Sequence, residues 1–423
     1  MTSFRFLHAA DIHLDSPLTG LAGVEGRVAE RIRTALRAAF KALVERAIEE
    51  QVDFIVIAGD LYDGSWRDYK TGLFFAEQMG RLNQAKVPVF VLHGNHDAES
   101  QITRPLTLPE NVNVFRTRSA QTFQIDGLNV ALHGQSYPEI AVEENLVPGY
   151  PAPVAGSFNI GVLHTALGGM GEHATYAPCS VQELVAKGYD YWALGHVHQG
   201  QVMHEQPHVV FPGNLQGRHV RETGRKGACL VTVEDSQVVE VDPIALDVVR
   251  WAVLDVDVTA AGNVPDVVDL VRDALVHSVS EAQGRLLAAR IVLRGRSALH
   301  ARLVTDVEDV TAQARAAAVG LGNEVAWVEK VAVQTAPEAD AAALAAREDT
   351  LGDLQRMLKE AGADEELLAQ LKEDIGELVG KLPHEVRDGC EDEVLAAAVA
   401  GAYGDLIEQV TPYLNARLMA EDN

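Results

Sequence analysis

The first ninety residues alternate between strand-like and helix-like segments, and this alternation constrains the fold more than any other feature. Residues 4–8, 53–58 and 87–91 are short apolar runs bounded by turn residues. Residues 27–50 and 70–84 instead repeat apolar side chains at helical spacing. Strands that alternate with helices in this way predict parallel strands joined by crossover helices. The sequence therefore predicts an α/β fold.

Beyond about residue 110 the strand-like segments lie closer together and helices become rarer. The strands predicted there cover residues 121–125, 128–133, 158–164, 190–194, 209–211, 228–233 and 237–241. Two stacked mixed β-sheets flanked by helices would accommodate them all.

Near Pro243 the pattern changes again. Residues 250–258 and 288–294 look like strands and residues 264–279 like a helix, so we expect a small α+β module. From Pro337 onward the chain is rich in Ala, Leu, Glu and Asp at helical spacing, which predicts several short acidic helices. The predicted regions are 1–245, 246–336 and 337–423.

The composition indicates a folded protein in a reducing compartment. Of its 423 residues, 47% are hydrophobic, yet we find no apolar run long enough for a membrane span and no signal-peptide pattern. Three widely spaced cysteines, Cys179, Cys229 and Cys390, form no metal-type pair. We therefore expect a cytoplasmic protein with reduced thiols that is not bound to a membrane.

Five short polar segments carry the chemistry, and each falls where a predicted strand ends. They are Asp11-Ile12-His13, Gly59-Asp60-Leu61-Tyr62-Asp63, Gly94-Asn95-His96-Asp97, His164 and Gly195-His196-Val197-His198. Loops at the carboxyl ends of strands in an α/β sheet gather on one edge. Residues two apart at a strand exit point the same way, so an Asp-x-His or His-x-His pair can face one ion. We expect the five segments to converge.

The chemistry of the converging side chains points to metal ions. Carboxylates, imidazoles and an amide without any cysteine suit Mn, Fe or Zn better than Ca or a thiolate site. Each segment alone would be a weak signal, because Asp and Asn also cap helices and form turns. All five in order, at strand ends, are very hard to obtain by chance.

This order of motifs resembles the calcineurin-like metallophosphoesterase superfamily over roughly residues 4–245. The resemblance implies two divalent metal ions, most simply Mn, with Fe, Zn or Mg as alternatives. It assigns Asp11, His13, Asp60 and His198 to one metal and Asp60, Asn95, His164 and His196 to the other. Asp60 would bridge the two ions, and a metal-activated water would attack the phosphorus. His96 would act at the scissile phosphate as acid or charge stabiliser, with Asp97 orienting its imidazole.

Within the superfamily the chain resembles DNA repair exonuclease subunits of the SbcD type. Three stretches carry this resemblance: residues 6–17, residues 190–198 and residues 211–219, the last followed by Glu222 and Gly224-Arg225-Lys226-Gly227. The resemblance implies DNA as substrate and an SMC-like ATPase as partner, docked by the C-terminal helices. A homodimer is also compatible with the sequence.

Several residues near the motifs keep two interpretations. Asp63 stands where some relatives have histidine, and it could support a ligand or relay a hydrogen bond. His93 could orient a metal histidine. Arg218 and His219 could contact a phosphate backbone or belong to a salt-bridged loop. His8, in contrast, lies on a buried strand and is predicted to be structural.

The net charge of −26 conflicts with a DNA substrate, because phosphate binding normally needs a basic face. The acidic C-terminal helices could be a solvated face or a partner site. The alternative to the nuclease is a phosphatase or nucleotide phosphodiesterase acting on a small molecule or a protein, since the same metal chemistry serves many substrates. A scaffold with a degraded site is disfavoured because every ligand position is filled.

Overall fold

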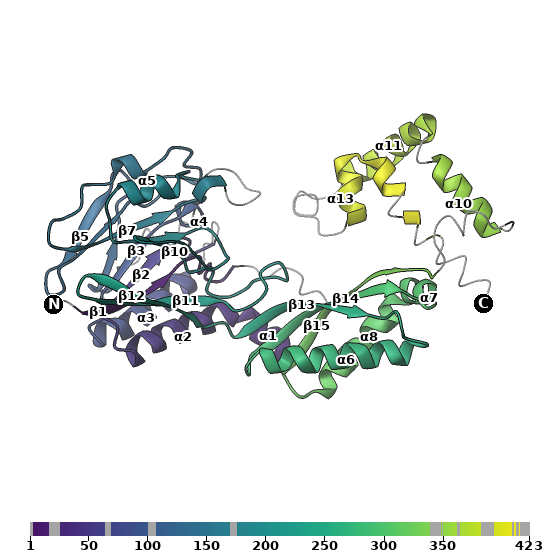
Figure 1. Ribbon diagram of the computed structural model, residues 1–423, viewed down its shortest axis with the longest axis horizontal. Coiled ribbons are helices and arrows are strands. Elements are labelled where there is room, and N and C mark those ends of the chain that lie inside the picture. The colour runs from purple at the N-terminus through teal and green to yellow at the C-terminus, as the bar shows by residue number, and fades with distance from the viewer. Residues whose placement is uncertain are drawn as a thin grey trace. The chain divides into compact units, whose positions relative to one another are not determined.

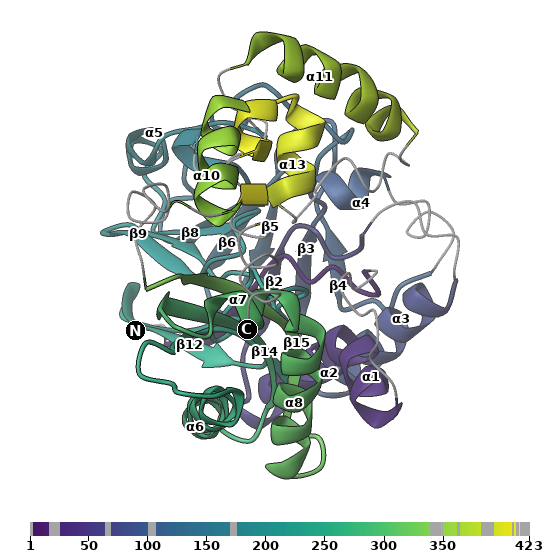
Figure 2. The same ribbon diagram turned by 90° about the vertical axis from the view of Figure 1, so that its right-hand side faces the viewer.

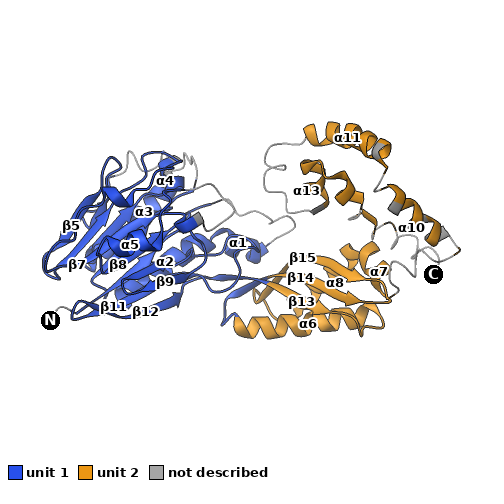
Figure 3. Cartoon of the chain, turned by 45° about the horizontal axis from the view of Figure 1, so that its top comes forward, with its two compact units in different colours: residues 1–252, 282–288 blue, residues 253–281, 289–423 orange. Residues whose placement is uncertain are grey.

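The computed structural model describes residues 3–16, 26–63, 69–99, 107–169 and 176–338, and parts of the C-terminal region (348, 350–361, 364–381, 393–407, 410–411 and 414). Pro17 and Cys390 lie outside these residues. The chain divides into two compact units. Unit 1 contains residues 1–252 and 282–288, and unit 2 contains residues 253–281 and 289–423 (Figure 3).

Unit 1 is built on two six-stranded mixed sheets. The first contains, in spatial order, β12 (Gln237–Ala245), β11 (Gly227–Glu234), β1 (Phe4–Ala9), β2 (Phe54–Ala58), β3 (Val89–Leu92) and β4 (Val112–Val114). Strands β1 to β4 are parallel, whereas β11 is antiparallel to both of its neighbours. The second contains β5 (Gln121–Ile125), β6 (Val130–Gly134), β7 (Phe158–His164), β8 (Tyr191–Gly195), β10 (His208–Phe211) and β9 (Gln201–Glu205). Its four central strands are parallel and both edge strands are antiparallel.

The two sheets stack face to face around an apolar core. Phe6 of β1 stacks on Phe54 of β2 at 4.9 Å between ring centroids, and Tyr191 of the second sheet meets Phe6 edge-on at 5.3 Å. The outer face of the first sheet is covered by α2 (Ala35–Glu49) and α3 (Tyr69–Gln84), and the second sheet carries α5 (Val181–Ala186) on its outer side (Figures 1 and 2). The predicted α/β fold with two stacked mixed sheets is confirmed.

The elements differ from the prediction in detail. The helix expected over residues 27–50 is two helices, α1 (Gly26–Arg33) and α2, separated at Thr34. The Thr34 hydroxyl donates to the carbonyl of Glu30, a local bond with which Ser and Thr compete with regular helix. Four short strands and α-helices of unit 1, namely β4, α4 (Asn95–Glu99), β9 and α5, were not predicted, because three to six residues carry little periodicity.

Unit 2 contains a three-stranded sheet of β13 (Val249–Asp257), β14 (Leu286–Arg296) and β15 (Ala326–Ala336), with β14 in the middle. Helices α6 (Val264–Glu281) and α8 (Val307–Gly320) pack against each other, and α8 packs on β15. The predicted strands and the helix α6 are present. Strand β15, α7 (His300–Thr305) and α8 complete the module and were not predicted. Strands β13 and β14 begin in unit 1, with residues 249–252 and 286–288, and continue into unit 2.

The described C-terminal residues form the predicted helices α10 (Thr350–Ala361), α11 (Glu365–Gly380) and α13 (Glu393–Ala400). Asp364 caps α11, because its side chain accepts from the backbone N–H groups of Glu366 and Leu367. Within the ranges that the structure describes, no helix is both long and apolar enough to span a membrane.

Candidate metal centre

The five polar segments converge at the carboxyl ends of parallel strands from both sheets. Each segment follows or ends one of the strands β1, β2, β3, β7 and β8, and Asn95 begins the short helix α4 (Asn95–Glu99). Their donor atoms lie close enough together to hold metal ions in three overlapping groups. These are Asp11, His13 and His198; His13, Asp60 and His96; and Asp60, His164 and His196. The predicted convergence is therefore present.

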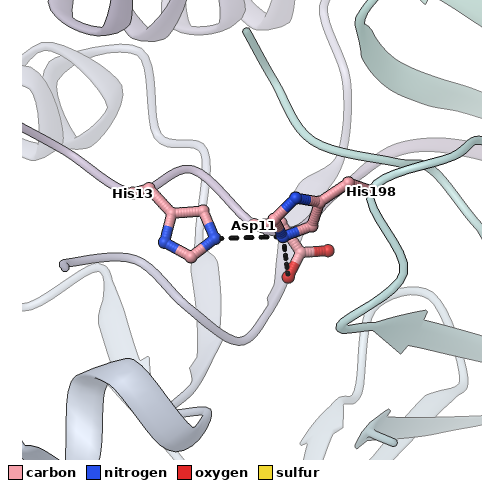
Figure 4. Close-up of side chains that lie close together, drawn as sticks. All are labelled: Asp11, His13 and His198. Carbon is pink, nitrogen blue, oxygen red and sulfur yellow. Dashed lines mark hydrogen bonds and ion pairs between the residues drawn. The ribbon is translucent and has the colours of Figure 1, made fainter. Parts of the chain in front are cut away.

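The first group, Asp11, His13 and His198, brings together two imidazoles and a carboxylate from segments that lie far apart in the sequence. The Nε2 atoms of His13 and His198 lie 3.2 Å apart, and Nε2 of His198 lies 4.0 Å from Oδ1 of Asp11 (Figure 4). Nε2 of His13 is also 4.0 Å from Oδ2 of Asp60. These four residues are the set that the resemblance assigns to one metal.

The other predicted ligand set, Asp60, Asn95, His164 and His196, is centred on His164, the last residue of β7. Its Nε2 lies 3.0 Å from Oδ1 of Asn95 and 3.3 Å from Oδ2 of Asp60. The ring of His196 lies edge-on to that of His164, with centroids 5.2 Å apart. Asp60 thus lies between the two groups, as a bridging carboxylate must.

The hydrogen bonds of His164 and His198 show that these residues fit metal ions. Nδ1 of His164 donates to the backbone carbonyl of Ala58, which can only accept. A neutral ring would therefore present a lone pair at Nε2 to the oxygens of Asn95 and Asp60, an arrangement in which only acceptors meet. A cation among these atoms resolves that conflict. His198 is arranged alike, because its Nδ1 donates to Glu222 over 2.7 Å and leaves Nε2 facing the first group.

At this site, burial and the neighbouring charges shift the pKa values of the carboxyl and imidazole groups in opposite directions. Burial raises the pKa of Asp11 to about 6, although nearby histidines oppose the shift. Burial also favours neutral Asp60, but His164, His13 and His96 outweigh it and keep the pKa of Asp60 well below its usual range. Burial lowers the pKa of His164, and Asp60 overcomes this and raises it to about 9. In the metal-free protein a proton therefore occupies the position between His164 and Asp60 that a cation would take.

The backbone at the site adopts a conformation that side chains other than glycine rarely take. Asp11, His13 and Asp60 have φ values of 49°, 48° and 50°, and His196 has 102°. Such residues cost roughly 1–3 kcal/mol each and persist where the surroundings fix them. The surroundings here are hydrogen bonds between the segments: Ile12 and His13 N–H both donate to the carbonyl of Asp60.

At two positions beside these ligands only glycine leaves enough space for the neighbouring atoms. A Cβ on Gly94 would collide with the carboxylate of Asp60, and one on Gly195 would collide with the carbonyl of Ala58. Neither glycine has a positive φ, so their role is to leave space for these groups.

His96 is oriented by Asp63, and the predicted role of Asp97 is wrong. Nδ1 of His96 lies 2.7 Å from Oδ1 of Asp63. Asp97 instead accepts backbone N–H groups from Leu61, Tyr62 and Gly94, and so fixes the loop after β2. Consecutive residues on a helix point about 100° apart, so Asp97 cannot face the same way as its neighbour.

Glu222, which no motif singled out, and Arg218, for which the sequence left two interpretations, complete the site. Glu222 is buried and accepts from His198, and Arg218 contacts both Asp63 and Glu222 at 3.4 and 3.2 Å. His219 lies 3.7 Å from Glu222. Arg218 and His219 therefore belong to a salt-bridged loop beside the metal ligands. The sequence signal for Glu222 was its place in the stretch after residue 211.

Three further histidines are not among the grouped donor atoms of the described residues. The backbone N–H of His93 donates to the hydroxyl of Ser136. His133 bonds to Thr122 and Asn159, away from the metal ligands. His8 is structural, as predicted, with both ring nitrogens bonded inside the sandwich.

Fold and site together define a phosphoesterase that uses two metal ions. The sequence matches the calcineurin-like phosphoesterase family over residues 4–200 and the YhaO metallophosphoesterase middle domain over residues 251–336. The chain belongs to the calcineurin-like metallophosphoesterases. It is 38% identical over 299 residues to an uncharacterized metallophosphoesterase, YhaO, of Bacillus subtilis, covering 70% of this chain and 72% of the relative.

Two further similarities are more distant. The chain is 29% identical over 231 residues to the DNA double-strand break repair protein Mre11 of Methanopyrus kandleri, covering 50% of this chain and 48% of that protein. Among solved structures, a dimetal phosphatase from Danio rerio is 13% identical, with a TM-score of 0.34, covering 56% of this chain and 94% of the other.

Proposed function

We propose that this protein is a DNA exonuclease of the SbcD type that hydrolyses phosphodiester bonds during DNA repair. The observation that carries the proposal is a complete dinuclear ligand set in a chain that also resembles Mre11 repair proteins. Because the chain spans about half of the Methanopyrus Mre11 and less of its Archaeoglobus counterpart, that activity is transferred here as a proposal only.

The residues of the site divide into those that hold metal and those that handle protons. Asp11, His13, Asp60 and His198 would hold one ion, and Asp60, Asn95, His164 and His196 the other. When bound, two divalent ions activate a water and neutralise charge on the phosphate; Mn is the ion we propose.

His96 is placed to give a proton to the leaving oxygen. Its side chain is 38% exposed, so a substrate can reach it, while Asp63 orients the ring. Burial lowers the pKa of His96, but Asp63 and Asp60 overcome this and raise it. The raised pKa favours the protonated, donating form of the ring.

A small phosphoester is the second candidate substrate, and the net charge favours it. At −26 the chain repels polyanions, whereas a nucleotide or phosphorylated metabolite carries few charges. The metal ligands do not separate the two cases, since substrate choice belongs to the surrounding loops.

One set of assays tests the proposed substrate. Purified protein with Mn would be incubated with single-stranded DNA, duplex DNA, mononucleotides and bis-p-nitrophenyl phosphate, with Asp60→Ala as the control for contaminating nucleases. We expect mononucleotides to be released from DNA ends. Hydrolysis of bis-p-nitrophenyl phosphate and nucleotides without any loss of DNA would contradict the nuclease and support the second candidate.

The C-terminal helices are proposed to dock an SMC-like ATPase in the cytoplasm. The net charge of this chain is strongly negative, so a partner could supply the basic surface that DNA binding needs. Truncation after about residue 335 should leave hydrolysis of bis-p-nitrophenyl phosphate intact but abolish co-purification with the ATPase. Unchanged binding of that partner by the truncated chain would contradict the proposed role.

A further inference from the structure

Arg218 lies beside the metal ligands with its side chain only 15% exposed. One end of its guanidinium, Nη1, lies 3.4 Å from Oδ2 of Asp63, and the other, Nη2, lies 3.2 Å from Oε1 of Glu222. The planar fork thus spans two carboxylates that come from different parts of the sequence.

Each of these carboxylates orients one imidazole of the site. Asp63 faces Nδ1 of His96 at 2.7 Å, and Glu222 faces Nδ1 of His198 at 2.7 Å. His96 is the proposed proton donor and His198 a metal ligand. One guanidinium therefore contacts the supports of two residues with different tasks.

The loop that carries Arg218 is itself firmly held. Oε2 of Glu222 accepts from the Arg218 backbone N–H at 2.7 Å and from the amide of Asn214 at 2.8 Å. Farther along, the indole N–H of Trp251 donates to the carbonyl of Gly217, and the amide of Gln216 donates to the carbonyl of Val249. These hydrogen bonds thus fix the backbone of the loop that carries the guanidinium.

We propose that Arg218 is a positioning residue that fixes Asp63 and Glu222 relative to each other and thereby aligns His96 with the metal ligand His198. The proposal rests on metal-dependent hydrolysis at this site and not on DNA as the substrate.

Electrostatics alone would not favour a guanidinium here. A positive charge next to a cation site repels the metal, and the Nε of Arg218 is buried without a hydrogen-bond partner among the residues that the structure describes. A buried donor without a partner costs about 1–3 kcal/mol. These two costs are offset if both ends of the fork are needed for geometry.

The charge of Arg218 and its positioning role have opposite expected effects on metal affinity, so a substitution can distinguish them. Arg218→Gln removes a positive charge, so it should tighten metal binding if the charge alone matters, and weaken it if positioning matters. We expect Mn binding, measured by isothermal titration calorimetry, to weaken about 10- to 100-fold, the range for residues that orient metal ligands. The kcat for bis-p-nitrophenyl phosphate should fall by a similar factor. Unchanged or tighter Mn binding by Arg218→Gln would overturn the proposal.

Two further variants control for charge and for folding. Arg225→Gln makes the same change in net charge at an exposed position seven residues away, and should leave Mn binding and kcat unchanged. Arg218→Lys keeps the charge, but one ammonium group cannot reach both carboxylates, so it should still weaken Mn binding at least about tenfold. If Arg218→Gln does not fold, as judged by circular dichroism of the metal-free protein, Arg218→Lys decides. Wild-type Mn affinity in Arg218→Lys would then overturn the proposal.

A double-mutant cycle tests the path through Glu222. If Arg218 acts on His198 by way of Glu222, the losses in Mn affinity of Arg218→Gln and Glu222→Gln should not add in the double variant. Additive losses would show that the two residues act independently, which contradicts the proposed path. The proposed substrate plays no part in these titrations, so their outcome is independent of whether the protein cleaves DNA.

Discussion

The middle of the β-sandwich and its carboxyl edge each bury a histidine completely, and the two differ in what surrounds the ring. His8, on β1, and His164, at the end of β7, are both 0% exposed. The ring of His8 bonds to the hydroxyl of Tyr191 at 3.0 Å and to the carbonyl of Leu194 at 3.1 Å. The carbonyl can only accept, so Nε2 donates to it and Nδ1 accepts from the hydroxyl. Every ring nitrogen of His8 is thus satisfied by protein alone.

His164 lacks this complementarity. One nitrogen donates to Ala58, and the other faces two oxygen atoms of Asn95 and Asp60. Burial alone therefore does not separate a structural histidine from a metal ligand. The chemical type of the second partner does, and the two regions should respond to mutation in opposite ways.

The largest effects are expected at the carboxyl edge. Asp60→Ala should lose both metal ions and all hydrolysis of bis-p-nitrophenyl phosphate, because this carboxylate lies between His13 of one ligand group and His164 of the other. His164→Ala should keep at most one tightly bound ion. Metal analysis of protein dialysed against Mn measures the stoichiometry. Two ions retained by Asp60→Ala would refute a bridging role.

His96→Ala should separate chemistry from metal binding. Turnover should fall by about 10²–10⁴-fold, the usual contribution of a positioned proton donor. Metal stoichiometry should stay at the wild-type value, since His96 is not among the predicted ligands. Steady-state kinetics together with metal analysis checks both. If His96→Ala and Asp60→Ala behave alike in Mn titration, this division of roles is wrong.

Asp63→Asn should give a smaller effect on turnover. An amide can still accept a hydrogen bond from His96 but lacks the charge that favours the protonated ring, so kcat should fall about 10- to 100-fold. Asp97→Asn is the informative comparison. It should leave the orientation of His96 unchanged and act through the loop after β2, because Asp97 accepts only backbone N–H groups there. In calorimetric unfolding, Asp97→Asn should lower the stability of the protein more than Asp63→Asn does.

His8 should affect stability and not catalysis. His8→Ala removes buried hydrogen bonds and should lower the free energy of unfolding by about 1–3 kcal/mol or more, with kcat and Mn binding unchanged. Urea unfolding at neutral pH measures this. A loss of Mn binding in folded His8→Ala would erase the distinction between the two regions.

The same histidine predicts a pH dependence of folding. Burial lowers the pKa of His8 to about 3, whereas an unfolded histidine has its ordinary value near 6.5. The unfolded state therefore binds more protons between these values, and the contribution of neutral His8 is lost as pH falls from about 6.5 towards 3. Each pH unit in that window costs up to about 1.4 kcal/mol. His8→Leu should flatten this slope in urea unfolding between pH 4 and 6.5, and an unchanged slope would contradict the assignment.

The sequence predicted the location of the site better than its hydrogen bonds. Strand periodicity placed Asp11, Asp60, Asn95, His164 and His196 at strand ends, and parallel strands bring such ends together. The residues that hydrogen-bond to the imidazoles could not be predicted from strand periodicity. Glu222 lies 24 residues beyond His198 and contacts it only because the loop folds back, and no local period reports such a return.

The error at Asp97 has a related cause. Adjacency in sequence suggested contact with His96, but helix α4 begins at Asn95 and turns the two side chains apart. The positive φ values at Asp11, His13 and Asp60 were also invisible, because these residue types ordinarily take extended or helical conformations. Short helices and strained turns are set by tertiary contacts, which single-sequence patterns do not contain.

The discontinuity of unit 1 limits how this domain can be inherited or transplanted. Residues 282–288 return to it after the chain has passed through unit 2, and there Arg285 pairs with the buried Asp247 at 2.9 Å, while Leu286 N–H donates to Val248. A recombination event with one breakpoint after residue 252 would carry away the sequence that this unit needs to finish folding. The segment 253–281, which belongs to unit 2, therefore has to be kept, or replaced by a short bridge, whenever the phosphoesterase is moved to a new protein. Gene fusions that preserve activity should respect two breakpoints and not one.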